Sequence, residues 1–135
     1  MKRIIAIMLL AALVGVQPTR AAELEKIRCT CYTDEGVTAS GAATRHGIIA
    51  GKREWLGNCA AIYSITEDGS VGDFIGYYEF LDTGAGMDTD GDGKGDTIIN
   101  GESVDIYRYT LKEAKNWIKT YGDYVYIKII ENVEG

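Results

Sequence analysis

Short runs of strand-forming residues, separated by glycines and acidic turns, constrain the fold of this chain most. Six such runs are rich in β-branched and aromatic residues, which favour strands, and they span residues 27–32, 48–50, 60–65, 74–81, 103–107 and 124–130. An Asp-Gly turn at Glu67–Ser70 predicts a hairpin between the third and fourth runs. With 17 glycines in 135 residues, this pattern favours a mainly β domain that closes into a small barrel over an alternating α/β sheet.

Only one segment has the signals of a helix. Thr110 and Glu113 form a capping box, and Gly122 supplies the C-terminal stop. The apolar residues between them fall on one stripe, which comprises Leu111, Ala114, Ile118 and Tyr121. The sequence therefore predicts one helix of about three turns in the C-terminal half. In the strand that follows, we expect Val125, Ile127 and Ile129 to face the core.

The first residues have the layout of a secretory signal peptide. Two basic residues precede an apolar run over residues 4–16 and a small-residue site that ends at Ala21. We therefore expect a signal peptide at residues 1–21, a linker at 22–27 and one domain at 28–135. A secreted, wall-associated monomer without membrane attachment is predicted, with an uncleaved anchor as the alternative.

Cleavage would leave 11 basic against 20 acidic residues, a net charge of 11 − 20 = −9. Such a surface repels phosphate backbones, so nucleic acid is excluded as a partner. The three cysteines, Cys29, Cys31 and Cys59, allow one disulfide plus one free thiol, or no pairing at all. Of these, a disulfide between Cys59 and one of the other two is predicted. A zinc site that adds His46, the single histidine, is the weaker alternative because the close second ligand pair is missing. Otherwise His46 is predicted to be a surface loop residue.

An acidic, glycine-rich segment predicts a structural calcium site. Gly93 and four aspartates match the spacing of an EF-hand-type loop, and those aspartates are Asp88, Asp90, Asp92 and Asp96. Alternate carboxylates can converge on a hard cation while the glycine permits the sharp turn. The twelfth position is Ile99, so Asn100 or Glu102 would have to replace the usual acid. A solvated surface loop without an ion is the alternative.

Asp105 is the strongest candidate for chemistry. It lies between Val104 and Ile106, where a carboxylate must be hydrogen-bonded, exposed on one face or shifted in pKa. A second carboxylate, Asp82, closes the apolar run that precedes Gly84. We expect the two aspartates to face each other across one groove. The alternative is that both cap turns at strand ends.

Five segments together resemble, in order and spacing, the motifs of the 3D domain: Thr30-Cys31-Tyr32, Val37-Thr38-Ala39-Ser40-Gly41, Leu56-Gly57, Asp82-Thr83-Gly84 and Val104-Asp105-Ile106-Tyr107. This domain is related to the catalytic part of MltA-type lytic transglycosylases and to small stationary-phase survival proteins. The match covers residues 28–133. The resemblance implies a six-stranded double-psi β-barrel that acts on the glycan strands of peptidoglycan.

The resemblance also implies roles for individual residues. Asp105 matches the general acid and base, Asp82 a second aspartate of the site, and Thr38 a threonine that lines the cleft. We expect Thr38, Tyr32 and Gly84 to contact substrate. One departure is that the family's aspartate and proline before the Leu-Gly turn are missing from Ala50–Trp55, where Glu54 is the only carboxylate.

Such an enzyme cuts the bond between N-acetylmuramic acid and N-acetylglucosamine without water and leaves an anhydro end. One carboxyl group acts first as acid and then as base, so its pKa must be raised towards neutrality. Two alternatives from another class remain open, a glycan-binding module that does not cut and a wall-loosening protein on the same barrel. The missing aspartate favours a binding module.

Overall fold

The computed structural model describes residues 23–131, so the expected signal peptide lies outside the described residues. The elements are β1 (Leu24–Tyr32), β2 (Ile48–Ala50), a short 3-10 helix η2 (Arg53–Trp55), β3 (Cys59–Ile65), β4 (Val71–Asp82), β5 (Ser103–Tyr107), α2 (Leu111–Tyr121) and β6 (Tyr124–Ile130). The prediction of a mainly β domain with six strands and one helix is confirmed. Across residues 23–131, no helix has the length and apolar character needed to cross a membrane.

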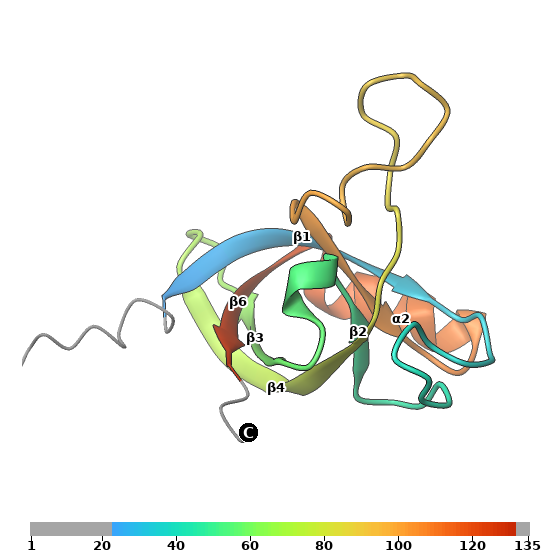
Figure 1. Cartoon of the computed structure of the whole chain (residues 1–135). Helices are drawn as coiled ribbons and strands as arrows, with labels where there is room; N and C mark the ends of the chain where they lie inside the picture. Colours follow the sequence, from blue (N-terminus) through green and yellow to red (C-terminus); the bar gives the residue numbers. More distant parts are fainter. Residues whose placement is uncertain (1–22, 132–135) are drawn as a thin grey trace, which may run out of the picture.

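The six strands form one sheet that curls into a ring (Figure 1). Their order is β1-β5-β2-β4-β3-β6, and β6 also pairs with β1, so each strand has a neighbour on both sides. Two pairs are parallel, β1 with β5 and β2 with β4. The other pairs are antiparallel. Two long loops, residues 33–47 and 83–102, join β1 to β2 and β4 to β5, and neither loop connects strands that are neighbours in the sheet.

The strand boundaries differ most from the sequence expectation at the starts of β1 and β4. β1 begins at Leu24, inside the segment expected to be a linker, because residues 24–28 pair with residues 124–128 of β6. β4 begins at Val71, before the expected start at residue 74, because it continues to the turn of the predicted hairpin with β3. Gly69 takes a φ of 89° in that turn, a conformation that glycine adopts without strain.

The core fills the inside of the ring and follows the alternation of the strands. Among its fully buried members are Cys29, Ile62, Phe80, Val104, Ile106 and Val125. The predicted core face of β6 is confirmed for Val125 and Ile127, and Ile129 packs against the core while partly buried. Because Val104 and Ile106 point inwards, alternation turns Asp105 to the opposite face of β5.

Helix α2 begins and ends where the sequence predicts. The Thr110 hydroxyl accepts a hydrogen bond from the Glu113 amide at 3.1 Å, and Gly122 ends the helix with a φ of 83°. Ala114 and Trp117 are the buried residues of the helix, and the Trp117 ring meets Tyr78 edge-on at 6.1 Å. Leu111 lies on the predicted apolar stripe but is 62% exposed, so it does not contribute to the core.

The predicted disulfide is wrong, since all three cysteines are free. Strand β6 lies between β1, which carries Cys29 and Cys31, and β3, which carries Cys59. Two strand spacings amount to about 10 Å, beyond the reach of an unstrained disulfide. Burial raises the pKa of the Cys29 and Cys31 thiols, that of Cys31 to about 12, so both stay protonated at neutral pH.

Candidate active site

The sheet register brings the two predicted aspartates together. Ala50 at the end of β2 is the pairing partner of Asp82 on β4 and also of Asp105 on β5. The two aspartates are therefore two strands apart, about 10 Å between backbones, with the small Ala50 side chain between them. Thr30 of β1 pairs with Asp105 and extends the row to a fourth strand. The two carboxyl groups thus lie near each other because both aspartates pair with the same residue, Ala50.

Ala50, Asp82 and Asp105 of this row line a cleft of about 270 Å³. Its walls come from the segment that follows β4 and from the loop between β1 and β2, and the lining residues are Tyr32, Asp34, Glu35, Gly36, Val37, Thr44, Ala50, Asp82, Thr83, Gly84 and Asp105. Among residues 23–131, four carboxyl groups line the cleft, whereas no lysine, arginine or histidine does. The cleft therefore suits a neutral ligand that accepts a proton, and it suits an anionic ligand less well.

Asp105 has the electrostatic environment of a proton donor. Burial raises the pKa of its carboxyl from 3.8 to about 6, the Thr30 hydroxyl opposes this by donating a hydrogen bond, and the charges of Asp34 and Asp82 raise it further. The Thr30 bond measures 2.8 Å and also fixes the orientation of the carboxyl. A carboxyl with such a pKa keeps a proton on a useful fraction of molecules near neutral pH.

Asp82 has a different environment, because three donors surround its carboxylate. The Tyr32 hydroxyl donates to Oδ2 at 2.9 Å, and the amides of Ala39 and Thr83 donate to Oδ1 at 3.0 and 2.9 Å. Burial raises the pKa of the Tyr32 phenol, so this donor keeps its proton. Hydrogen bonds of this kind hold the accepting carboxylate in place. Asp82 is thus a fixed carboxylate beside a carboxyl that can carry a proton.

Two of the three predicted substrate-contacting residues line the cleft, and the third does not. Tyr32 and Gly84 line the cleft. Thr38 is only 5% exposed and is not among the lining residues. Its hydroxyl lies 3.0 Å from that of Ser40 and accepts a hydrogen bond from the Ala42 amide at 3.2 Å. In this arrangement Thr38 shapes the loop between β1 and β2, and its contact with substrate stays a prediction.

Asp34, Glu35 and Ala50 are among the lining residues that were not identified from the sequence. Asp34 and Glu35 follow directly after β1 and bring two further carboxyl groups to the cleft. The signal for them was an acidic pair at the end of a predicted strand, next to the resembling motif that contains Tyr32. Ala50 gave no signal, because its role depends on pairing with two distant strands.

A second hollow adjoins the cleft. It has a volume of about 420 Å³ and is lined by Arg53, Glu54, Thr83, Gly84, Ala85 and Ile99. The cleft and this hollow share Thr83 and Gly84. Glu54, the only carboxylate where the resembling family has an aspartate, therefore lies in the neighbouring hollow and not beside Asp105.

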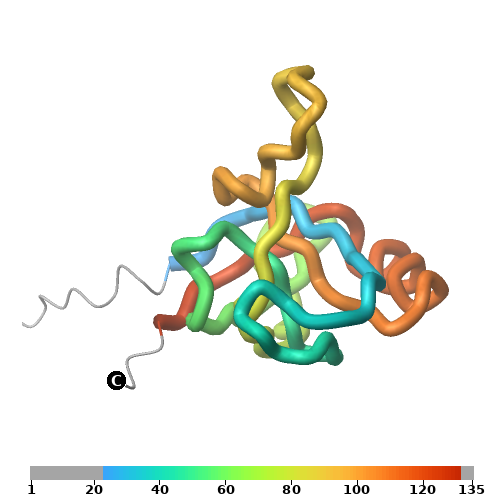
Figure 2. Tube along the Cα trace, turned by 45° about the vertical axis from the view of Figure 1, so that its right-hand side comes forward, coloured from blue at the N-terminus to red at the C-terminus, as the bar shows by residue number. Residues whose placement is uncertain are grey.

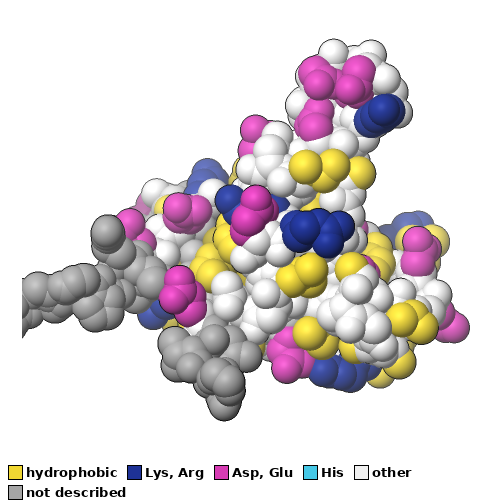
Figure 3. All heavy atoms as spheres, viewed as in Figure 1, with side chains coloured by type: hydrophobic (Ala, Val, Ile, Leu, Met, Phe, Trp, Pro, Cys, Tyr) yellow, Lys and Arg dark blue, Asp and Glu magenta, His cyan; other side chains and the backbone are white. Residues whose placement is uncertain are grey.

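Part of the predicted calcium loop has the geometry of a cation site. The loop rises away from the barrel (Figures 1 and 2), and acidic side chains gather at its tip (Figure 3). Carboxylate oxygens of Asp88, Asp90 and Asp96 lie within 4.8 Å of one another. Asp92 is not in this group and instead accepts a hydrogen bond from the Lys94 amide at 2.8 Å. Gly93 has a φ of 87°, as the predicted sharp turn requires.

These three carboxylates are the residues that would hold a hard cation, which oxygen ligands suit. At the twelfth position of the loop, Ile99 offers no ligand and is 61% exposed. The alternative zinc set is not assembled, since among residues 23–131 only the three aspartates are spaced for an ion. His46 instead lies 2.8 Å from a carboxylate oxygen of Glu113 and stacks on Tyr109 at the surface.

The chain matches no protein-family model, no curated protein and no solved structure.

Proposed function

We propose that this protein is a secreted enzyme that cuts the glycan strands of peptidoglycan as a lytic transglycosylase. The observation that carries the proposal is the Asp105 carboxyl, whose pKa burial raises to about 6, in a cleft that it shares with Asp82. An acid of this kind can protonate a glycosidic oxygen near neutral pH. The order of motifs that resembles the 3D domain supplies the substrate class.

The reaction needs one group that changes roles. The Asp105 carboxyl donates its proton to the oxygen that links N-acetylmuramic acid to N-acetylglucosamine, and the carbon–oxygen bond breaks as the N-acetylglucosamine leaves. The resulting carboxylate then takes the proton of the 6-hydroxyl on the muramyl sugar while that oxygen bonds to the anomeric carbon. Asp105 ends protonated, no water is consumed, and the product carries an anhydro ring.

Asp82 has a supporting role in this scheme. Its carboxylate, held by three donors, would stabilise the positive charge that develops on the sugar ring as the bond breaks. Ala50 leaves the space between the two acids free for the ring, because its side chain is a single methyl group. Tyr32 both fixes Asp82 and presents its ring to the cleft.

The topology supports the double-psi β-barrel that the resemblance implies. Such a barrel has parallel strand pairs in an otherwise antiparallel ring, and the pairs β1 with β5 and β2 with β4 have that arrangement. The two long loops, residues 33–47 and 83–102, border the cleft. We also propose that the aspartate loop binds a structural Ca²⁺ through Asp88, Asp90 and Asp96.

The test is digestion of purified peptidoglycan with products identified by mass. The proposal expects soluble muropeptides with anhydro ends, each lighter by one water than a hydrolytic product. Asp105→Asn should abolish release. Asp73→Asn, which removes the same charge from an exposed position of β4, should leave release unchanged. Hydrolytic ends, or full release by Asp105→Asn, would contradict the proposal.

A glycan-binding module that does not cut is the second candidate. It is favoured by the position of Glu54, which leaves the cleft without a replacement for the aspartate that the resembling family has before its Leu-Gly turn. Co-sedimentation with insoluble peptidoglycan, together with no soluble product from the same sample, would decide for the binding module.

A further inference from the structure

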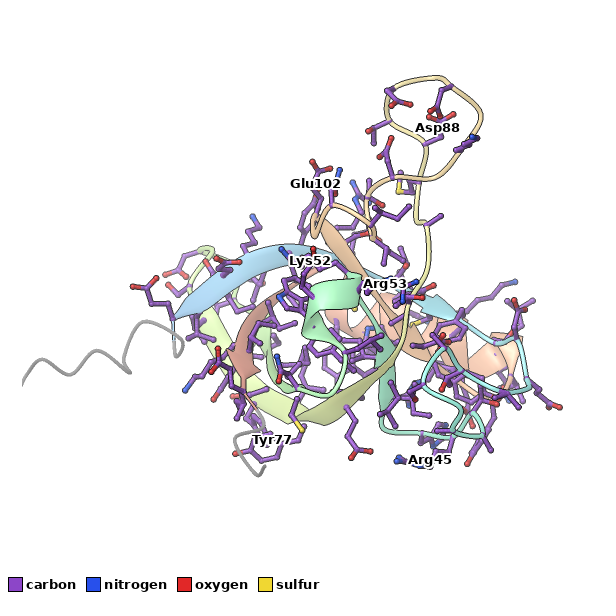
Figure 4. The ribbon with its side chains drawn as sticks, in the orientation of Figure 1. Arg45, Lys52, Arg53, Tyr77, Asp88 and Glu102 are labelled. Carbon is purple, nitrogen blue, oxygen red and sulfur yellow. The ribbon has the colours of Figure 1, made fainter. Side chains whose placement is uncertain are left out.

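The hollow beside the cleft differs from the cleft in the charge of its lining residues and in having exposed apolar residues. Of the residues that the structure describes, Arg53 is the only one with a cationic side chain that lines the cleft or this hollow. It projects from η2 near the chain that leaves β4 (Figure 4), and lysine and arginine atoms form a patch in the middle of this face (Figure 3). Beside it, Ile99 is 61% exposed and Ala85 adds a methyl group. A guanidinium next to apolar surface is suited to a short branch with a methyl group and a carboxylate.

The Arg53 guanidinium is available for such a ligand. Within residues 23–131 the ion pairs join Arg45 to Glu79 and His46 to Glu113, and none involves Arg53. Its neighbour Lys52 faces a different hollow, where its ammonium lies 5.0 Å from the centre of the Trp55 ring. An exposed arginine without a partner can form two parallel hydrogen bonds to an incoming carboxylate.

We propose that this second hollow is a subsite for the carboxylate-bearing side branch of the glycan, and that Arg53 is its specificity-determining residue. The inference rests on the proposed function for the identity of the polymer and deepens it. A sugar ring placed between Asp82 and Asp105 would send the lactyl branch of its muramyl unit past Thr83 and Gly84 to Arg53. The acidic cleft would take the uncharged ring, and the arginine would take the anion.

Glu54 gives the proposal a second, opposite consequence. Its carboxylate lines the same hollow as Arg53, so it repels an incoming anion and weakens the arginine's attraction. Removing the Glu54 charge should therefore strengthen binding of a carboxylate-bearing glycan, whereas removing the Arg53 charge should weaken it. Both side chains are exposed, so neither change is expected to unfold the protein.

The test is calorimetric titration of Asp105→Asn protein, which binds without cutting. Three ligands are compared: a neutral N-acetylglucosamine tetramer, an alternating N-acetylglucosamine and N-acetylmuramic acid tetramer without peptide, and the same tetramer with its peptides. We expect at least one muramyl tetramer to bind roughly tenfold tighter than the neutral one. Preference for the peptide-free form assigns the lactyl carboxylate, and preference for the other form assigns a peptide carboxylate.

Adding Arg53→Gln should abolish the preference for the muramyl tetramer while leaving the neutral tetramer's affinity unchanged. Adding Glu54→Gln should increase the preference for the muramyl tetramer. Lys52→Gln is the matched control and should preserve it. Absence of a preference, absence of binding, or equal loss with Arg53→Gln and Lys52→Gln would overturn the inference. Because cleavage is not measured, an inactive but selective protein would remove the proposed function and keep the subsite.

Discussion

Replacing Asp105 by asparagine should stabilise the folded protein at neutral pH. The pKa of the Asp105 carboxyl is raised from 3.8 to about 6, so the folded state binds this proton more tightly than the unfolded chain does. The wild-type protein therefore loses stability as pH rises from 3.8 towards 6. At about 1.4 kcal/mol per pKa unit, the loss is about 3 kcal/mol, an upper value because the group is partly exposed to solvent.

Asparagine has the shape of the protonated acid and cannot ionise, so the variant avoids this loss. Urea unfolding at several pH values measures the difference in the free energy of unfolding between the two proteins. We expect almost no difference near pH 3 and a gain of about 2–3 kcal/mol for Asp105→Asn above pH 7. Asp73→Asn controls for the loss of one surface charge. Equal stability of wild type and Asp105→Asn at every pH would refute the claim that Asp105 is desolvated.

Three further predictions concern other parts of the molecule. Asp34→Asn should shift the alkaline limb of the pH–activity profile to lower pH, because the Asp34 charge raises the pKa of Asp105; an unchanged limb would contradict this. Calcium at a hundredfold excess over Kd should stabilise the folded protein by about 2.7 kcal/mol and so raise the melting temperature in thermal denaturation. Asp88→Asn should remove this stabilisation. Identical melting curves with and without calcium would argue for a solvated loop. Trp117→Ala should cost about 3–5 kcal/mol in urea unfolding, since Trp117 is 7% exposed and packs on Tyr78; a loss below about 1 kcal/mol would show that α2 is not part of the core.

Elements that depend on interactions within one segment could be predicted from the sequence. The capping residues of α2 and the alternation in β6 specify structure within one segment, so both could be predicted. The exposure of Leu111 could not be predicted, because helical periodicity shows which residues share a stripe but not where the stripe meets the core. The start of β1 was missed because residues 24–28 are held by pairing with β6, about 100 residues away in the chain.

The candidate site was predictable where a residue was chemically unusual in its surroundings. Asp105 was conspicuous because it lies between two apolar neighbours. Asp82 was identified because it closes an apolar run and belongs to a motif that resembles the 3D domain. The residues that complete the site have ordinary sequence contexts. Ala50 matters because two strands from different parts of the chain flank it, and Arg53 because a short helix brings it beside Thr83 and Gly84. Such positions depend on long-range pairing, which one sequence does not display.

The proposed reaction requires Asp105 to hold a proton near neutral pH inside the cleft. A carbon-13 NMR titration of its side-chain carboxyl measures that proton, with Asp105→Asn used to assign the signal. We expect a midpoint near pH 6, as burial raises the pKa to about that value, and a lower midpoint in Asp34→Asn. A midpoint near 3.8, the ordinary value, would mean that the carboxyl is ionised at neutral pH and would contradict its role as the acid.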